Sequence, residues 1–119
     1  MKEYQHNSTV KGFHVYKEIW NPVKGEILDT RMELENPTDK YAVCVENNGN
    51  VVGHLTKGNN GHFSKKIFFF LRAEEYGSCK IRIRKSKAIN RGDGMEVEYT
   101  LEFIGQRQFI DILRANLKD

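Results

Sequence analysis

The sequence predicts a mainly β protein, an antiparallel barrel or sandwich of about six short strands with two helices at its ends. Three observations predict this class. Short runs of β-branched and aromatic residues alternate apolar with polar side chains, which is the period of a half-buried strand. An Asn-Gly pair separates two of these runs. Segments with helical spacing of apolar residues follow only later, which disfavours a parallel sheet of alternating strands and helices.

The N-terminal half contains two expected strands and then a turn. Gly12–Trp20 mixes aromatic with β-branched residues, and Asn21-Pro22 ends it. Gly25–Leu34 alternates less regularly and predicts a second, bulged strand. Glu35–Asp39 predicts a turn, because proline fixes φ while Asn and Asp side chains accept hydrogen bonds from the nearby backbone.

A hairpin is the most specific local prediction. Tyr41–Glu46 and Val51–Leu55 are strand-like runs on either side of Asn47–Asn50. The Asn-Gly pair between them favours a type I′ turn, because both central residues of that turn need a positive φ.

The C-terminal half alternates helices with strands. Helices are expected over Phe63–Tyr76 and Gln106–Lys118, and strands over Ser78–Ser86 and Met95–Ile104. The apolar helix faces are expected to consist of Phe63, Ile67, Phe70 and Leu71 in the first helix, and Phe109, Ile112, Leu113 and Leu117 in the second. In Ser78–Ser86, period two places Cys79, Ile81 and Ile83 inside and Lys80, Arg82 and Arg84 outside.

Length and composition indicate one intracellular domain without a membrane segment. The chain has 119 residues, an ordinary size for one domain, and we expect a polar segment over 1–10 and a barrel over 11–119. Cys44 and Cys79 lie in strand-like runs and not in a disulfide framework, which indicates a reduced compartment. Met1–Thr9 has no apolar stretch of a secretory signal, and the longest apolar block, Ile67–Leu71, is too short to cross a bilayer.

The basic residues are unevenly distributed. The net charge is +3, yet six basic residues and no acid lie between Lys80 and Arg91. A basic stripe on a nearly neutral protein is one footprint of a nucleic-acid partner. An ordinary solvated face is the first alternative. The second is that the stripe lines one groove together with Lys57, Lys65 and Lys66.

Residue patterns typical of enzymes are absent, so we predict no catalytic residue, metal ion or cofactor. The four histidines and two cysteines form no Cys-x₂-Cys or His-x₃-His ligand set. Gly92–Gly94 lacks the lysine of a phosphate-binding loop. Glu96, Glu98 and Glu102 share one expected strand, which predicts a solvated row and not a two-metal site.

One stretch resembles the signature of a known family. Asn36-Pro37-Thr38-Asp39 leads into Ala42-Val43, and Val52-Gly53-His54-Leu55 ends the second hairpin strand. Both motifs and the spacing between them resemble the signature motifs of the HIRAN domain family. The specific motifs cover Asn36–Lys57, and the similarity extends over nearly the whole chain. It implies an antiparallel, six-stranded OB-like barrel with two helices. HIRAN domains occur as stand-alone units and fused to SWI2/SNF2-type ATPases or nucleases, and the resemblance leaves both arrangements open.

The resemblance implies a non-catalytic module that binds single-stranded DNA at or near a 3′-hydroxyl end. Asp39 matches the acid that accepts the terminal hydroxyl. His54 and Lys57 match residues near the last nucleotides and their phosphates. His14 and Tyr16 fall in the family's first-strand cluster.

The basic stripe and two departures from the family pattern complete the expected site. Arg82 and Arg84 are expected to contact phosphates. Val15 and Thr38 stand where the family's DNA-binding member has aromatic residues. Two platforms for base stacking are therefore missing at those positions.

The resemblance also implies a nuclear protein, and we expect a monomer whose partner is single-stranded DNA. The alternative is an interaction domain that keeps the barrel and binds a protein or peptide through a sheet edge. Local chemistry offers simpler roles too: Asp39 as a turn cap, His54 as a polar rim residue and Tyr16 as part of the core.

Overall fold

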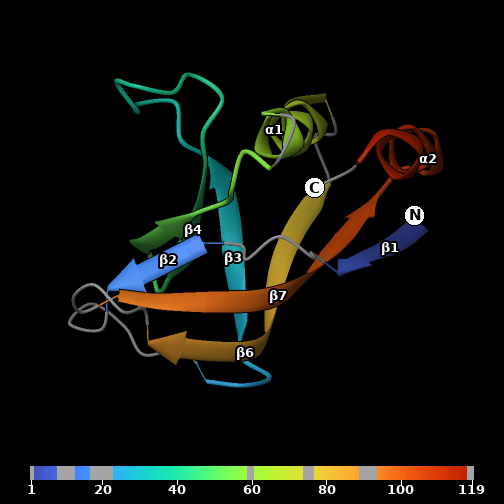
Figure 1. Ribbon diagram of the computed structural model, residues 1–119. Coiled ribbons are helices and arrows are strands. Elements are labelled where there is room, and N and C mark those ends of the chain that lie inside the picture. The colour runs from blue at the N-terminus through green and yellow to red at the C-terminus, as the bar shows by residue number, and fades with distance from the viewer. Residues whose placement is uncertain are drawn as a thin grey trace.

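A computed structural model describes residues 2–7, 13–16, 23–58, 61–73, 77–88 and 94–117. Seven strands and two helices lie in these ranges (Figure 1). The elements are β1 (Lys2–Asn7), β2 (Phe13–Tyr16), β3 (Ile27–Met32), β4 (Val43–Asn47), β5 (Asn50–His54), α1 (Phe63–Ala73), β6 (Ser78–Ala88), β7 (Gly94–Gly105) and α2 (Arg107–Asn116).

All described strands belong to one antiparallel sheet. The order is β1-β7-β6-β3-β4-β5, and β2 also pairs with β7. Strand β7 pairs along its length with β6, while β2 pairs with its first residues and β1 with its last ones. Because β2 also lies against β5, the sheet curls back toward its own far edge, as Figure 1 shows. The result is the predicted antiparallel, barrel-like arrangement.

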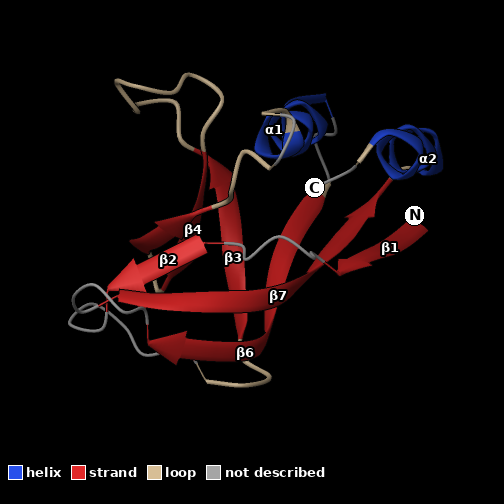
Figure 2. Ribbon diagram, viewed as in Figure 1, coloured by secondary structure: helices blue, strands red, loops and turns tan. Residues whose placement is uncertain are grey.

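Two irregularities give the sheet its curvature. The β6–β7 register shifts between Ile83 and Lys85, and the β4–β5 register shifts between Val45 and Glu46. An extra residue on one strand bends that strand and increases its twist. The long β6–β7 pair therefore bends partway along its length, which Figure 2 shows in red.

The predicted hairpin is confirmed. Asn47 pairs with Asn50, and the two residues between them, Asn48 and Gly49, have φ values of 52° and 84°. Both central residues are thus left-handed, as a type I′ turn requires.

The core fills the space between the sheet and the two helices, which lie next to each other at one end (Figure 2). Phe63 and Ile67 of α1 and Tyr99 and Phe103 of β7 are fully buried. The inward-facing residues of β6 are Cys79, Ile81 and Ile83, as their period predicts. Phe63–Ala73 and Arg107–Asn116 confirm the two expected helices, and no helix among the described residues has the length and hydrophobicity to cross a membrane.

The structure adds to one expectation and corrects two others. Lys2–Asn7, within the expected polar N-terminal segment, forms a strand in addition to the predicted ones, because its backbone pairs with the free side of β7. On α2, Ile112 is 62% exposed and Ile110 is buried, because the buried face is centred between Ile110 and Leu113. Thr100, which lies between Glu98 and Glu102 in the row of acids expected to be solvated, is buried. Of the strand expected over Gly12–Trp20, the structure describes Phe13–Tyr16 as β2, and the other expected residues lie outside the described ranges.

Candidate functional site

The loop between β3 and β4 holds Asp39 in place through a chain of side-chain-to-backbone hydrogen bonds. The Asn36 Oδ1 accepts from the backbone N–H groups of Thr38 and Asp39, both at 2.9 Å. The Asp39 Oδ1 in turn accepts from the Tyr41 N–H at 3.0 Å. The turn chemistry predicted for Asp39 is therefore present, and it uses one of the two carboxylate oxygens.

The second oxygen of Asp39 lies toward a cation. The Lys57 Nζ is 3.9 Å from the Asp39 Oδ2. The Lys57 side chain is 66% exposed and the Asp39 side chain 24% exposed, so a ligand from solvent can reach both. Two of the residues predicted from the family motif are thus brought together, although they lie on different sides of the β4–β5 hairpin.

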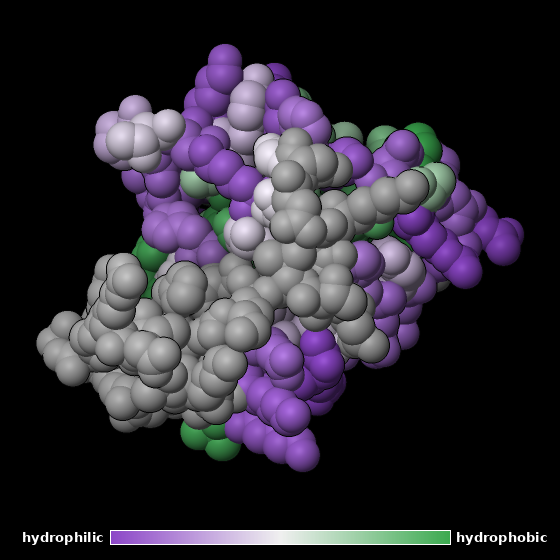
Figure 3. Space-filling view, in the orientation of Figure 1, coloured by the Kyte–Doolittle hydropathy of each residue, from purple (hydrophilic) through white to green (hydrophobic). Residues whose placement is uncertain are grey.

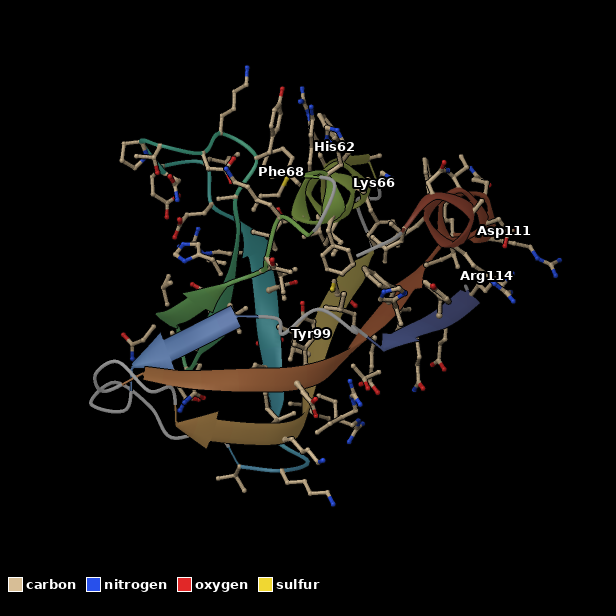
Figure 4. The ribbon with its side chains drawn as sticks, viewed as in Figure 1. His62, Lys66, Phe68, Tyr99, Asp111 and Arg114 are labelled. Carbon is tan, nitrogen blue, oxygen red and sulfur yellow. The ribbon has the colours of Figure 1, made fainter. Side chains whose placement is uncertain are left out.

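These two residues line a hollow of about 190 Å³ at the start of α1. Its walls also include Tyr41, Gly61, His62, Ser64 and Lys65. Gly61 has a φ of 79°, a left-handed value that favours glycine, where the chain enters the helix. Figure 4 labels His62 at the start of α1, and Figure 3 shows hydrophilic side chains gathered over this region and the β3–β4 loop.

The electrostatics of the hollow favour an anion beside a hydrogen-bond donor. Lys57 and Lys65 supply two positive charges. The N-terminus of α1 adds the partial positive charge of a helix dipole. Asp39 is a carboxylate that accepts hydrogen bonds and repels a second anion placed directly against it. A group that carries a phosphate and a nearby hydroxyl satisfies both requirements.

His54 is linked to the turn before Asp39 by a buried acid, Glu33. Its Nε2 lies 2.8 Å from the Glu33 Oε1, and the Asn36 Nδ2 donates to the same oxygen at 2.7 Å. Burial works to raise the pKa of the Glu33 carboxyl, but the hydrogen bonds from Asn36 and His54 outweigh it, so this pKa lies below its usual range. Glu33 therefore stays charged and fixes His54 and the Asn36 turn together.

His14 and Tyr16 lie on β2. The backbone of this strand pairs with β7, with His14 opposite Glu96 and Tyr16 opposite Gly94. Strand β2 also lies next to β5, whose last residue is His54. The first-strand cluster is therefore on a strand next to the one that ends at His54, while the side chains of His14 and Tyr16 are outside what the structure describes.

The basic stripe is at the other end of the sheet. Arg82 pairs with Ile27 at the start of β3, whereas Glu33 immediately follows the end of that strand. At about 3.3 Å per residue, six residues of strand separate them by about 20 Å. The stripe therefore does not share a groove with Lys57 and Lys65.

Acids accompany the stripe. The Arg82 Nε donates to the Glu102 Oε2 at 3.0 Å, and the Lys80 Nζ lies 3.5 Å from the Asp29 Oδ1. Arg82 and Arg84 do line a second hollow, together with Lys24, Lys85 and one acid, Glu98. Their predicted phosphate contacts, if formed, belong to a part of the strand distant from Asp39.

Sequence reasoning missed several residues that line the Asp39 hollow, and also Glu33, which contacts His54. Glu33, His62 and Ser64 carry no motif signal, since a buried glutamate and a helix start are defined by tertiary packing. Tyr41 lies inside the family motif, and its two-residue distance from Asp39 could have indicated a place in the same wall. Within the described residues, no group of three or more His, Cys, Asp or Glu side chains could hold a metal ion.

Comparison with known proteins agrees with the predicted fold. No protein-family model matches the chain, and no curated protein matches it. Among solved structures, the chain is similar to the HIRAN domain of human HLTF, with a TM-score of 0.60 and 19% sequence identity over 97% of this chain and 85% of that one. The chain therefore has a HIRAN-like fold, as the motifs within Asn36–Lys57 predict.

Proposed function

We propose that this chain is a non-catalytic DNA-binding module that holds single-stranded DNA at or near a 3′-hydroxyl end. The observation that carries the proposal is the meeting of the Asp39 carboxylate and the Lys57 ammonium in one open hollow at the start of α1. The HIRAN-like fold supports it, because the motif residues Asp39, His54 and Lys57 lie at one end of that fold.

The hollow offers each part of a terminal nucleotide a partner. The 3′-hydroxyl donates a hydrogen bond to the Asp39 Oδ2, the oxygen that the Tyr41 N–H does not occupy. The adjacent phosphate lies against Lys57, Lys65 and the first turn of α1. A 3′-phosphate in place of the hydroxyl brings two anions together and is rejected.

His54 acts as a second contact to the strand. Its imidazole is 47% exposed although Nε2 contacts Glu33. The ring is thereby oriented by a charged partner while its other edge faces solvent. In this proposal that edge contacts the nucleotide before the terminal one.

Fluorescence anisotropy with short single strands tests the proposal. We expect strands with a 3′-hydroxyl to bind at least tenfold more tightly than strands with a 3′-phosphate, since a hydrogen bond to a charged group contributes about 1.5–3 kcal/mol. A closed circular strand of the same composition controls for binding away from ends. Equal affinity for hydroxyl, phosphate and circular strands contradicts end recognition.

Salt dependence separates this function from peptide binding at a sheet edge. Release of counterions from phosphates makes DNA affinity fall steeply with salt, whereas strand addition to a sheet edge depends on backbone hydrogen bonds. Failure to bind any DNA, together with binding of an extended peptide that is insensitive to salt, favours the interaction domain instead.

A further inference from the structure

The Asp39 hollow has an aromatic wall. Tyr41 comes two residues after Asp39 and lines the same hollow. Its ring centroid lies 5.2 Å from that of Phe69 and 5.6 Å from that of Phe68. Phe68 is buried in the core, whereas Phe69 is 39% exposed. The Tyr41 ring thus packs against the buried ring of Phe68 on the core side and against the partly exposed ring of Phe69 on the solvent side.

Two cations lie over the ring of Tyr41. The Lys65 Nζ is 4.6 Å from its centroid and the Lys40 Nζ 5.2 Å. Lys40 is exposed and Lys65 is half-buried. Flexible ammonium groups on an aromatic face show that this face is reachable from solvent, because a ring packed on both faces by core side chains has no room for them.

Thr38 supplies no aromatic ring at a position where the family's DNA-binding member has one. It lies directly before Asp39, it is exposed, and its hydroxyl donates to the Asn36 Oδ1 at 3.1 Å. A threonine engaged in this turn provides no π-face for a base. Within the described side chains that line the hollow, Tyr41 carries the one phenol ring, beside the smaller imidazole of His62.

We infer that the Tyr41–Phe69 pair is the platform on which the base of the terminal nucleotide stacks. This inference rests on the proposed function, because the sugar of that nucleotide is the one held by Asp39. Tyr41 lines the same hollow as the Asp39 carboxylate, so a base attached to that sugar lies within reach of its ring. The Tyr41–Phe69 pair thus provides the stacking surface that Thr38 lacks.

Replacement of the Lys40 and Lys65 ammonium groups by a base on the Tyr41 ring is favourable. An exposed cation–π contact is weaker than stacking of a base on an aromatic ring. When the base covers Tyr41, Lys40 and Lys65 move off the ring, and the phosphate of the same nucleotide receives them. The free protein therefore holds its phosphate-binding cations beside the position where they are needed.

A two-by-two comparison of protein and DNA tests the platform. The proteins are the wild type and Tyr41→Ala, and the strands end in a normal nucleotide or in an abasic one, both with a 3′-hydroxyl. Stacking changes affinity by about 5- to 150-fold per base. We expect the wild type to lose about tenfold on the abasic end, and Tyr41→Ala to lose the same on the normal end. On the abasic end, Tyr41→Ala and wild type should bind equally.

Matched variants guard against a general loss of structure. Tyr41→Phe keeps an aromatic ring and should therefore keep the difference in affinity between normal and abasic ends. Ile112→Ala removes an exposed apolar side chain of α2 and should have no effect. If Tyr41→Ala does not fold, Tyr41→Leu replaces it, because leucine retains apolar volume against Phe68 without a π-face.

The two proposals fail in different ways. If Tyr41→Ala weakens binding equally on normal and abasic ends, the base does not stack on this ring and the inference is wrong. If the wild type is indifferent to an abasic end, it is wrong as well. The wild type could instead bind 3′-hydroxyl and 3′-phosphate ends equally well and still bind normal ends more tightly than abasic ones. That result contradicts end recognition by Asp39 but supports stacking on Tyr41.

Discussion

Glu33 and His54 are joined by a 2.8 Å contact between a buried carboxylate and a half-exposed imidazole. Glu33 follows the end of β3 and His54 ends β5, so this contact spans β4, which lies between the two strands. The same carboxylate oxygen accepts from the Asn36 side chain. One acid therefore connects the turn before Asp39 with the strand before Lys57.

The protein should lose stability at acid pH, because protonation of Glu33 removes the contribution of its charged form. The pKa of this carboxyl is lowered from its ordinary value of 4.5, so the charged form is favoured in the folded state. Its contribution is fully present above pH 4.5 and is lost as the pH falls through the lower, folded-state pKa. Urea unfolding of wild type and Glu33→Gln from neutral to acid pH checks this. We expect the difference between the two proteins to shrink toward low pH, and a constant difference would contradict the assignment.

Replacing Asp39 should affect end binding more than folding. Asp39→Asn keeps an oxygen that can accept from the Tyr41 N–H but removes the charge. We expect about ten- to hundredfold weaker binding to 3′-hydroxyl strands for Asp39→Ala, and an intermediate loss for Asp39→Asn. Binding to circular strands should change little in both. Anisotropy titrations measure the affinities, and thermal unfolding of each variant reports any loss of the turn cap.

Lys57 and the Arg82–Arg84 pair should differ in how their effects depend on strand length. Lys57→Met should flatten the salt slope by about 0.7 on strands of any length, since one phosphate contact is lost. Arg82→Ala with Arg84→Ala, about 20 Å away along β3, should leave a strand of about four nucleotides unaffected. It should flatten the slope only for strands of about sixteen, near the upper end of barrel site sizes. An unchanged slope on long strands contradicts phosphate contacts by this pair and leaves Arg82 with its ion pair to Glu102.

Neither cysteine should react in the native protein. Cys44 and Cys79 are buried, free thiols, and burial raises the pKa of Cys44 to about 11 and of Cys79 to about 12. The reactive thiolate is therefore scarce near neutral pH. Mass spectrometry after iodoacetamide treatment should show no adduct on native protein and two in urea. Rapid labelling of Cys44 without denaturant would contradict the burial of β4.

Substitutions of the two central residues of the β4–β5 turn should have different effects on stability. Gly49 has a φ of 84°, and Asn48 has a φ of 52°. Gly49→Ala should destabilise the fold by about 1–2 kcal/mol, because a Cβ is unfavourable in the left-handed region. Asn48→Gly should be nearly neutral, since glycine adopts that conformation freely. Urea denaturation measures both, and equal effects would argue against a type I′ turn.

The sequence predicts those features that depend on neighbours along the chain. The hairpin, the inward face of β6 and the two helices follow from turn chemistry and periodicity, and the family motif identifies Asp39, His54 and Lys57. Partners from distant segments could not be predicted. Glu33 binds His54 because β3 and β5 flank β4, and Arg82 meets Glu102 because β6 pairs with β7. No local pattern encodes these pairings, and Lys2–Asn7 is a strand only because β7 offers it an edge.

The pairing of β1 with β7 has a consequence for synthesis of the chain. Lys2 lies opposite Gly105, and Asn7 lies opposite Thr100, so β1 is translated before the other described strands and its partner β7 after them. Until β7 leaves the ribosome, β1 has no edge to join and β6 lacks the strand with which it shares its longest pairing. The nascent chain can close the β4–β5 hairpin early, because its two strands are adjacent in sequence. Completion of the sheet, by contrast, has to wait until β7 has been translated, because β1 and β6 both pair with it.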